Sequence, residues 1–339
     1  MDIQKFLEEN IVVDCHLDLL FDVEIQRKLG RKNVIVEDYF PRFKAGGINI
    51  VVSSLYIENE YIPEGALRKA MAQISCLYSE VEESNGEIII IKEYNDILMA
   101  IQENKIGIML SFEGIEPLQR DIRLLKTFYE LGVRMVGINW SRGNSAADGC
   151  KYNDYNYIGY GLTEFGVELV KQAEELGMII DVTHLNEKSF WDVLDISKNP
   201  VIASHSNCRS VSDTPRNLSD EQIKAICEKN GVICFNANSM LVSHNNIENA
   251  NVLQYIKHIK YVKDTLGSSC IGFGFDLCDY ILKYSLDIKI IEGAVFDTFN
   301  GYYDIKLILQ NLHKQGFDLN DMQNLAGKNI LRVFRTVLK

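Results

Sequence analysis

The sequence predicts a single (β/α)₈ barrel, a TIM-like α/β fold, over residues 1–339. Eight short runs rich in Val and Ile alternate with longer amphipathic segments. The runs are apolar nearly throughout, as expected of parallel strands that are covered on both faces. Barrels of this type commonly use a chain of this length as one unit. A doubly wound open sheet is the alternative, but no G-x-G-x-x-G motif follows the first run.

The predicted strands, in order, cover residues 11–15, 48–57, 106–112, 133–139, 178–183, 201–204, 232–236 and 270–275. Amphipathic helices are predicted at 64–84, 162–177, 219–231, 251–266, 303–315 and 320–337. The helix at 219–231 opens with a capping box, Ser219 and Gln222, and we expect it to end at Gly231. No linker or internal repeat interrupts this order, so one domain is predicted.

Composition excludes several classes of protein. The formal charge of −12 and the lack of Lys/Arg clusters argue against nucleic acid as a partner. No apolar stretch approaches the roughly 20 residues that span a bilayer, and the N-terminus lacks the pattern of a signal peptide. The eight cysteines contain no C-x-x-C pair. We therefore expect reduced cysteines and a soluble, cytoplasmic protein, with disulfides as the less favoured alternative.

Ionisable residues stand at the ends of the apolar runs. The first run leads into His16 and Asp18, which share one face of an extended strand because they are two residues apart. The other strand-end residues are Glu113, His184, His205 and Asp276. The carboxyl ends of barrel strands are where such folds carry their chemistry. A polar pair that merely caps a strand would explain His16 and Asp18 alone, but not the whole set.

The set predicts a metal centre. Burying so many ionisable groups without a cation would cost several kcal/mol. Imidazole and carboxylate ligands without thiolate suit Zn²⁺ or a neighbouring divalent ion. Five ligands are too many for one catalytic zinc, and a bridging carboxylate such as Glu113 suits two ions. The other ligands are His16, Asp18, His184 and His205.

The remaining histidines and Cys15 have simpler interpretations. His258 and His313 lie in helical segments and are read as packing or surface residues. His244, in a polar loop, is a weak candidate for a substrate contact. Cys15 is expected to pack on the strand face opposite His16.

At these residues the sequence resembles the membrane (renal) dipeptidase family, zinc-dependent barrel enzymes that hydrolyse dipeptides. The resemblance runs through "VVDCHLDLL", "LSFEGIEPL", "DVTHLNEKSFWDVL", "PVIASHSNCRSVSDTPRNLSDEQI" and "IGFGFD" to "LAGKNILRVFRTVL", which covers essentially the whole chain. The ordered set of H-x-D, S-x-E-G, D-V-(S/T)-H, S-H-S and P-R-N is more specific than any one of its members.

The resemblance implies a role for each matching residue. His16 and Asp18 would bind one zinc, His184 and His205 the other, with Glu113 between them. Arg216, in "TPRN", would hold the carboxylate of the substrate, a task that suits a guanidinium fork. Asp276 would lie near the bridging water and the amino group of the substrate. From this position we expect it to take a proton from the attacking water and pass it to the leaving amine. A small-molecule dipeptide substrate and a homodimer are also implied.

Two positions depart from the family pattern. Trp140 stands where family members often carry a histidine that contacts the scissile carbonyl, so a packing role and a substrate contact are both open for it. Cys278 replaces the second Asp of "G-x-D-F-D-G". The leading hypothesis is a metal-dependent dipeptidase. The alternatives are the same chemistry on an N-acyl amino acid, a D-residue dipeptide or a lactone, and a barrel that binds a ligand without catalysis.

Overall fold

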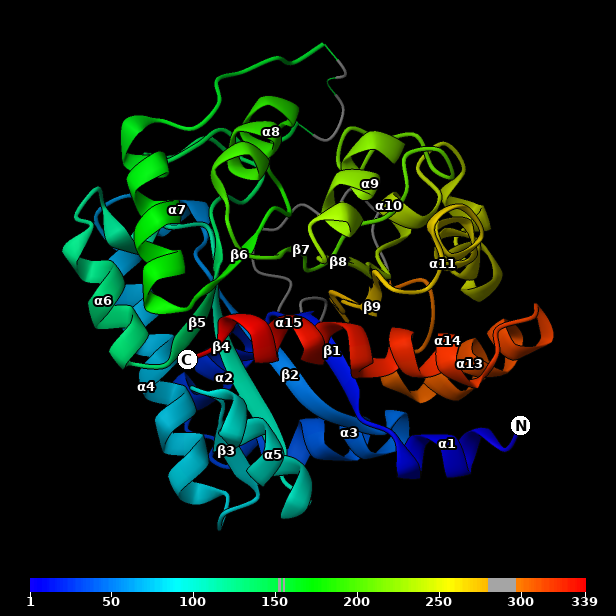
Figure 1. The fold of residues 1–339 in the computed structure, drawn as a ribbon. Coiled ribbons are helices and arrows are strands. Elements are labelled where there is room, and N and C mark those ends of the chain that lie inside the picture. Colours follow the sequence, from blue (N-terminus) through cyan, green and yellow to red (C-terminus); the bar gives the residue numbers. More distant parts are fainter. Residues whose placement is uncertain (152–153, 155, 280–296) are drawn as a thin grey trace.

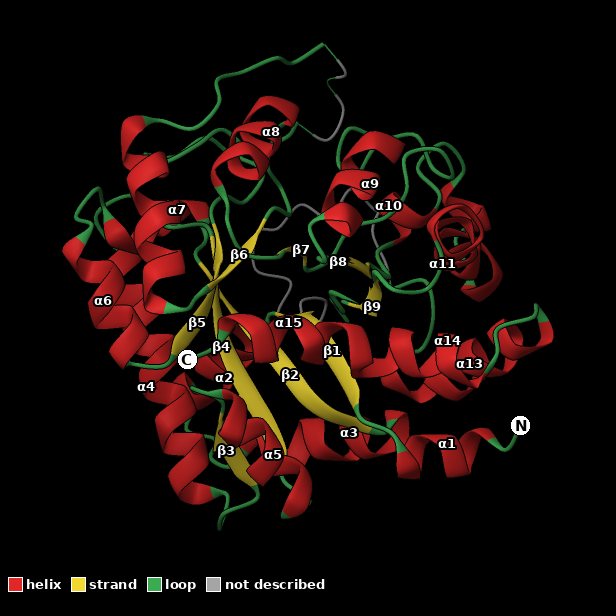
Figure 2. Ribbon diagram, in the orientation of Figure 1, coloured by secondary structure: helices red, strands yellow, loops and turns green. Residues whose placement is uncertain are grey.

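The computed structural model describes residues 1–151, 154, 156–279 and 297–339. These residues form a closed barrel of parallel strands surrounded by helices, as the sequence predicts (Figures 1 and 2). The eight barrel strands are β1 (Val12–Leu17), β2 (Ile48–Tyr56), β4 (Ile106–Glu113), β5 (Val133–Gly137), β6 (Ile179–Asp181), β7 (Val201–Ala203), β8 (Val232–Phe235) and β9 (Ile271–Phe273). Each overlaps one predicted strand.

Pairing between β2 and β4 closes the sheet, which rules out the open doubly wound alternative. The sequence did not predict the short strand β3 (Ile88–Ile90). Gly107 of β4 pairs with Ile50 of β2 and also with Ile89 of β3, so β2 and β3 lie on opposite edges of β4. From Leu110 onward, β5 pairs with β4. The strand β3 therefore extends one edge of β4 and is not part of the ring.

The helices of the described residues pack around the barrel and across its amino end. They are α1 (Ile3–Glu9), α2 (Leu19–Lys28), α3 (Phe40–Gly46), α4 (Ala66–Glu83), α5 (Tyr94–Gln102), α6 (Arg123–Glu130), α7 (Glu164–Leu176), α8 (Glu187–Ile196), α9 (Asp220–Glu228), α10 (Ser239–Val242), α11 (Val252–Leu266), α13 (Ile305–Lys314), α14 (Leu319–Gln323) and α15 (Asn329–Val337). The predicted capping box of α9 is present, but the helix ends three residues before Gly231. Among the described helices, none is both long and apolar enough to cross a membrane.

The amino end of the barrel is filled by apolar side chains. Inward-facing residues from the first halves of the strands, such as Val13 and Ile50, form one buried cluster with α15. Val333 and Phe334 supply part of the α15 face, and Figure 1 shows this helix lying across the strands. Such a cluster stabilises the barrel by removing apolar area from water. It leaves only the carboxyl end for polar chemistry.

A bulge in β1 sets the direction of the first metal-ligand candidate. The register between β1 and β2 runs from Asp14 opposite Val51 to Leu17 opposite Ser53, so three steps on β1 match two on β2. A bulge of this kind re-aims side chains and breaks the two-residue alternation. Cys15 packs in the apolar cluster, as expected, while His16 reaches the polar end of the barrel.

The expectation that all the cysteines are reduced is wrong for one pair. Cys227 and Cys270 form a disulfide across 43 residues. Cys227 lies on the last turn of α9 and Cys270 immediately precedes β9, so the packing of α9 beside the barrel brings together two residues that no local pattern connects. Because disulfides are uncommon in cytosolic proteins, the cysteines no longer support a cytoplasmic location, which stays a prediction.

Candidate metal centre

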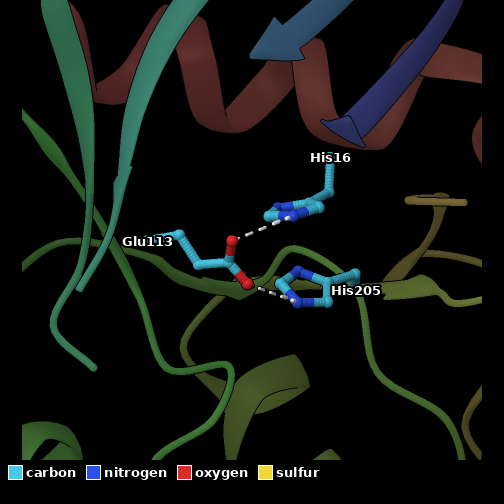
Figure 3. Close-up of side chains that lie close together, drawn as sticks. All are labelled: His16, Glu113 and His205. Carbon is cyan, nitrogen blue, oxygen red and sulfur yellow. Dashed lines mark ion pairs between the residues drawn. The ribbon is translucent and has the colours of Figure 1, made fainter. Parts of the chain in front are cut away.

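Glu113 lies at the centre of the polar cluster. It is the last residue of β4, and its side chain is 7% exposed. Its two oxygens face different partners, as Figure 3 shows: Oε2 lies 3.7 Å from Nε2 of His16, and Oε1 lies 3.7 Å from Nε2 of His205. Oε1 is also 3.2 Å from Nε2 of His184. The strand thus places one carboxylate between His16 on one side and the pair of His184 and His205 on the other.

The first group gathers acidic side chains around His16. Its Nε2 lies 3.6 Å from Oδ1 of Asp18 and 3.9 Å from Oδ1 of Asp276. The Ser54 hydroxyl donates to Asp18, and Nδ2 of Asn236 donates to Oδ2 of Asp276 at 2.9 Å. Asp276 follows β9 in a left-handed backbone conformation, with φ of 53°. Together with Glu113, this makes three carboxylates around the buried imidazole of His16.

The second group pairs two imidazoles. Nε2 of His184 lies 2.9 Å from Nε2 of His205. The outer ring nitrogens each contact a serine hydroxyl at 2.8 Å, Ser141 for His184 and Ser204 for His205. Like Asp276, His184 has a left-handed backbone, with φ of 68°. Non-glycine residues rarely adopt this conformation, and the strain is characteristic of functional sites.

The protonation equilibria of the cluster reflect its burial. Burial opposes the charging of His16, but the carboxylates of Glu113 and Asp18 outweigh it and raise its pKa to about 10. Burial, with a smaller contribution from Asp18, raises the pKa of Glu113 well above its ordinary value. Burial also lowers the pKa values of His184 and His205 well below the usual range, so both imidazoles are neutral at pH 7.

The donor set fits a cation. Nε2 of His16 and Oε2 of Glu113 are buried and have no hydrogen-bond partner among the described residues. Buried polar atoms without partners are costly, and each of these two atoms is a potential metal ligand. Two overlapping sets of three ligand atoms could hold an ion, because the atoms within each set lie within 4.8 Å of one another; both sets include His16, and neither includes His184. They are His16 with Glu113 and His205, and His16 with Asp18 and Asp276.

The two other predicted site residues border this cluster. Arg216 is 3% exposed; its Nη1 donates to Ser206, and its Nη2 lies 3.2 Å from Nε2 of His184. Nε of Arg216 has no partner among the described residues. Trp140 packs edge-to-face against Tyr56, with ring centroids 5.6 Å apart, and its ring lies 6.1 Å from that of His184. Both residues are therefore beside the imidazole pair.

The histidines outside the cluster have other surroundings. His258 is fully buried in α11, where Nδ1 accepts the backbone N–H of Cys208 and Nε2 contacts the carbonyl of Val242. His313 lies exposed on α13. His244 is held through its backbone N–H by Ser212. These positions agree with packing and surface roles for His258 and His313.

Sequence reasoning missed two buried carboxylates beneath the cluster. Asp14 accepts the backbone N–H groups of His16 and Phe275, and Asp181 accepts those of Thr183 and Ser204. Each lies within three residues of a histidine of the cluster. The available signal was an Asp near the carboxyl end of an otherwise apolar strand, in "VVDCH" and "IIDVTH".

The chain is similar to known proteins over nearly its whole length. The family model described as "Membrane dipeptidase (Peptidase family M19)" matches residues 1–339. An uncharacterized protein in the PQQ-III 3′ region of Acinetobacter calcoaceticus is 34% identical over 192 residues, which cover 56% of this chain and 61% of that protein. Dipeptidase verJ of Clonostachys rogersoniana is 24% identical over 352 residues, covering 98% of this chain and 86% of that protein.

A solved structure shares the whole fold. A metallopeptidase from Rhodobacter sphaeroides, crystallised with a phosphinate mimic of the dipeptide L-Ala-D-Ala, superposes with a TM-score of 0.84 and 22% sequence identity. The alignment covers 97% of this chain and 99% of that one. At this level of identity the likeness establishes the barrel fold.

Proposed function

Because the chain belongs to the membrane dipeptidase family, peptidase family M19, we propose that it hydrolyses dipeptides with two divalent metal ions held at the carboxyl end of the barrel. One observation carries the proposal: Oε2 of Glu113 faces His16, while its Oε1 faces His184 and His205. A carboxylate in this position is suited to bridge two cations.

The ligands divide between the two sides of Glu113. His16 and Asp18 would hold one ion, and His184 and His205 the other. Imidazole and carboxylate donors without thiolate favour zinc, so we propose Zn²⁺ as the metal. When bound, such ions lower the pKa of a water molecule and polarise the carbonyl group of the substrate.

Asp276 is proposed to move the proton. Its Oδ2 is held by Asn236, while Oδ1 is directed toward His16 and is free of hydrogen bonds among the described residues. Burial raises the pKa of Asp276 to about 6, near the range where a carboxylate both accepts and releases a proton efficiently. The side chain is 21% exposed, which leaves access for a substrate.

Arg216 is proposed to bind the carboxylate of the dipeptide. Its Nη atoms are fixed by Ser206 and by the carbonyl of His205, while its buried Nε–H has no partner among the described residues. An oriented N–H beside the imidazole pair suits an anionic group of the substrate. We therefore expect a free C-terminal carboxylate to be required.

Trp140 is the reason to test a second group of substrates. Its indole offers one N–H donor and no positive charge, in contrast to a protonated histidine. N-acyl amino acids, D-residue dipeptides and lactones are therefore the alternative substrates for the same chemistry. The mimic bound by the R. sphaeroides enzyme contains a D-residue, which makes L-Ala-D-Ala a useful member of a test panel.

Elemental analysis and a substrate panel test the proposal. The purified protein should contain two equivalents of zinc, lose hydrolysis of mixed dipeptides when treated with a chelator, and recover it when zinc is restored. Dipeptides amidated at the C-terminus serve as the matched control for Arg216. Failure to cleave any dipeptide while cleaving acyl-amino acids or lactones would replace the substrate class but keep the metal chemistry.

The variant Asp276→Asn separates catalysis from binding. It should lower kcat by about 10³-fold, because a proton acceptor is lost, while zinc content stays at two. Unchanged hydrolysis in this variant would contradict the role of Asp276. A cytoplasmic location and a homodimer stay predictions; fractionation and light scattering test them.

A further inference from the structure

One carboxylate is bonded to the segments that carry both imidazoles of the pair. Oδ1 of Asp181 accepts the backbone N–H of Thr183 at 2.9 Å and that of Ser204 at 3.0 Å. Thr183 immediately precedes His184, and Ser204 immediately precedes His205. Asp181 is 4% exposed and ends β6, so it joins the end of β6 to the end of β7.

The second oxygen of Asp181 reaches a metal-ligand candidate through a hydroxyl. The Ser204 hydroxyl donates its single hydrogen to Oδ2 of Asp181. Its oxygen also lies 2.8 Å from Nδ1 of His205, so this contact requires an N–H on Nδ1. A neutral imidazole with hydrogen on Nδ1 has its lone pair on Nε2, and Nε2 of His205 is the atom that faces Glu113. This chain of hydrogen bonds from Asp181 through Ser204 to His205 forms a relay. The relay selects the tautomer of His205 that can bind a cation.

His184 lacks this relay. Its Nδ1 contacts the Ser141 hydroxyl at 2.8 Å, and that hydroxyl also lies 3.8 Å from Sγ of Cys150. No carboxylate among the described residues bonds to Ser141, so its hydrogen is free to point either way. The two imidazoles of the pair are thus oriented by different means.

We propose that Asp181 is a positioning residue that acts through Ser204 to hold His205 in its Nδ1–H tautomer, and thereby sets the affinity for the metal ion bound by His184 and His205. The proposal rests on the proposed function, because it assumes that these imidazoles bind a metal. Hydrogen-bond partners of this kind typically contribute 10- to 100-fold to metal affinity.

The substitution Asp181→Asn changes the relay but keeps its shape. The amide oxygen can still accept the two backbone N–H groups, so the amide nitrogen takes the place of Oδ2. That nitrogen donates to Ser204, whose hydroxyl hydrogen then turns toward Nδ1 of His205. His205 would carry its hydrogen on Nε2 and lose the lone pair that faces Glu113. We expect zinc affinity at this position to fall by about 10- to 100-fold.

The chain offers a matched control in Asp14. Its Oδ1 accepts two backbone N–H groups, those of His16 and Phe275, and its Oδ2 accepts the hydroxyl of Tyr302. This bonding pattern equals that of Asp181, but the hydroxyl belongs to a phenol that is bonded to no imidazole of the cluster. Asp14→Asn therefore disturbs the middle of β1 without a tautomer change at His205, and zinc affinity at the His184–His205 position should change less than threefold.

The experiment measures zinc affinity and tautomer separately in the full chain. Zinc binding to wild type, Asp181→Asn, Ser204→Ala and Asp14→Asn is followed by competition with a chromophoric chelator. Imidazole ¹⁵N shifts of the metal-free proteins report which nitrogen of His205 carries hydrogen. We expect zinc affinity to fall in Asp181→Asn and in Ser204→Ala. The double variant that combines these two substitutions should show no further loss of zinc affinity, because both act on one path.

Each outcome decides the proposal. Wild-type zinc affinity in Asp181→Asn, an Nδ1–H signal retained in that variant, additive losses in the double variant, or an equal loss in Asp14→Asn would overturn it. Wild-type protein that binds no zinc or cleaves no dipeptide would instead defeat the proposed function. The tautomer measurement needs no metal and still tests the relay in that case.

Discussion

The two halves of the barrel hold their site residues in different ways. In the first half the strands are long, and β1, β2 and β4 contain 6, 9 and 8 residues. His16 lies within β1 and Glu113 ends β4, so the sheet ladder itself positions them. In the second half β6, β7 and β9 contain three residues each, and His184, His205 and Asp276 follow them in loops.

Side-chain hydrogen bonds replace the ladder in the second half. Asp181 and Ser204 orient the His205 ring, and Asn236 holds Asp276. The left-handed backbones of His184 and Asp276 need such support, because strained conformations persist only where their surroundings determine them. A single polar or steric change should therefore matter more in the second half than a similar change in the first.

The largest effect is expected at Glu113, which faces both halves. Glu113→Gln keeps the size of the side chain but replaces one carboxylate oxygen with an amide nitrogen that cannot bind a cation. We expect kcat/KM to fall by about 10⁴-fold, equivalent to about 5 kcal/mol, and zinc content to fall below two. Steady-state kinetics and elemental analysis measure both. Two retained zinc ions with near-normal hydrolysis would show that Glu113 is no bridge.

The disulfide tests how strongly the second half depends on a covalent link. Breaking the Cys227–Cys270 bond should lower the free energy of unfolding by about 4 kcal/mol, as the loop it closes spans 43 residues. Denaturant unfolding of Cys227→Ser, and of wild type with and without a reductant, measures this. Cys76→Ser, at a free cysteine on α4, is the control. Equal free energies of unfolding for wild type with and without the reductant would contradict the prediction.

Substitution of two glycines by alanine compares the steric tolerance of the two halves directly. A Cβ on Gly274 would lie 1.8 Å from the backbone oxygen of Ser204, whereas one on Gly107 would meet the flexible end of Ile91 at 2.9 Å. We expect Gly274→Ala to cost about 3 kcal/mol of unfolding free energy and Gly107→Ala about 1 kcal/mol or less. Denaturant titration of both variants tests this, and equal costs would argue against the difference between the halves.

The smallest expected effect is a loss of folding stability at low pH that is caused by His258, which lies on α11 in the second half. Burial lowers its pKa to about 4, against about 6.5 when exposed. Below pH 6.5 the unfolded chain takes up a proton that the folded chain does not, so stability is lost as pH falls from 6.5 to 4. From pH 7 to 5 this amounts to about 2 kcal/mol. Between pH 7 and 5, the free energy of unfolding of wild type should fall by that much more than that of His258→Asn. Parallel pH profiles of the two proteins would refute the lowered pKa of His258.

Local patterns were sufficient to predict most of the framework. Apolar runs of Val and Ile predicted all eight barrel strands, and the polar residues beyond them predicted the set that gathers at Glu113. The short strand β3 was missed because three isoleucines carry no periodic signal. Asp14 and Asp181 were missed because their partners, such as Phe275 and Ser204, are chosen by the pairing of neighbouring strands.

By itself, the sequence determined the alternation of strands and helices and which ionisable side chains would meet at the carboxyl end of the barrel. Both follow from residue spacing and from the parallel direction of the strands. Only the tertiary structure decided the bulge that aims His16, the hydroxyl relay to His205 and the Cys227–Cys270 link. Each of these depends on contacts between separate elements, and the free energy of such contacts is set by packing rather than by any local run of residues.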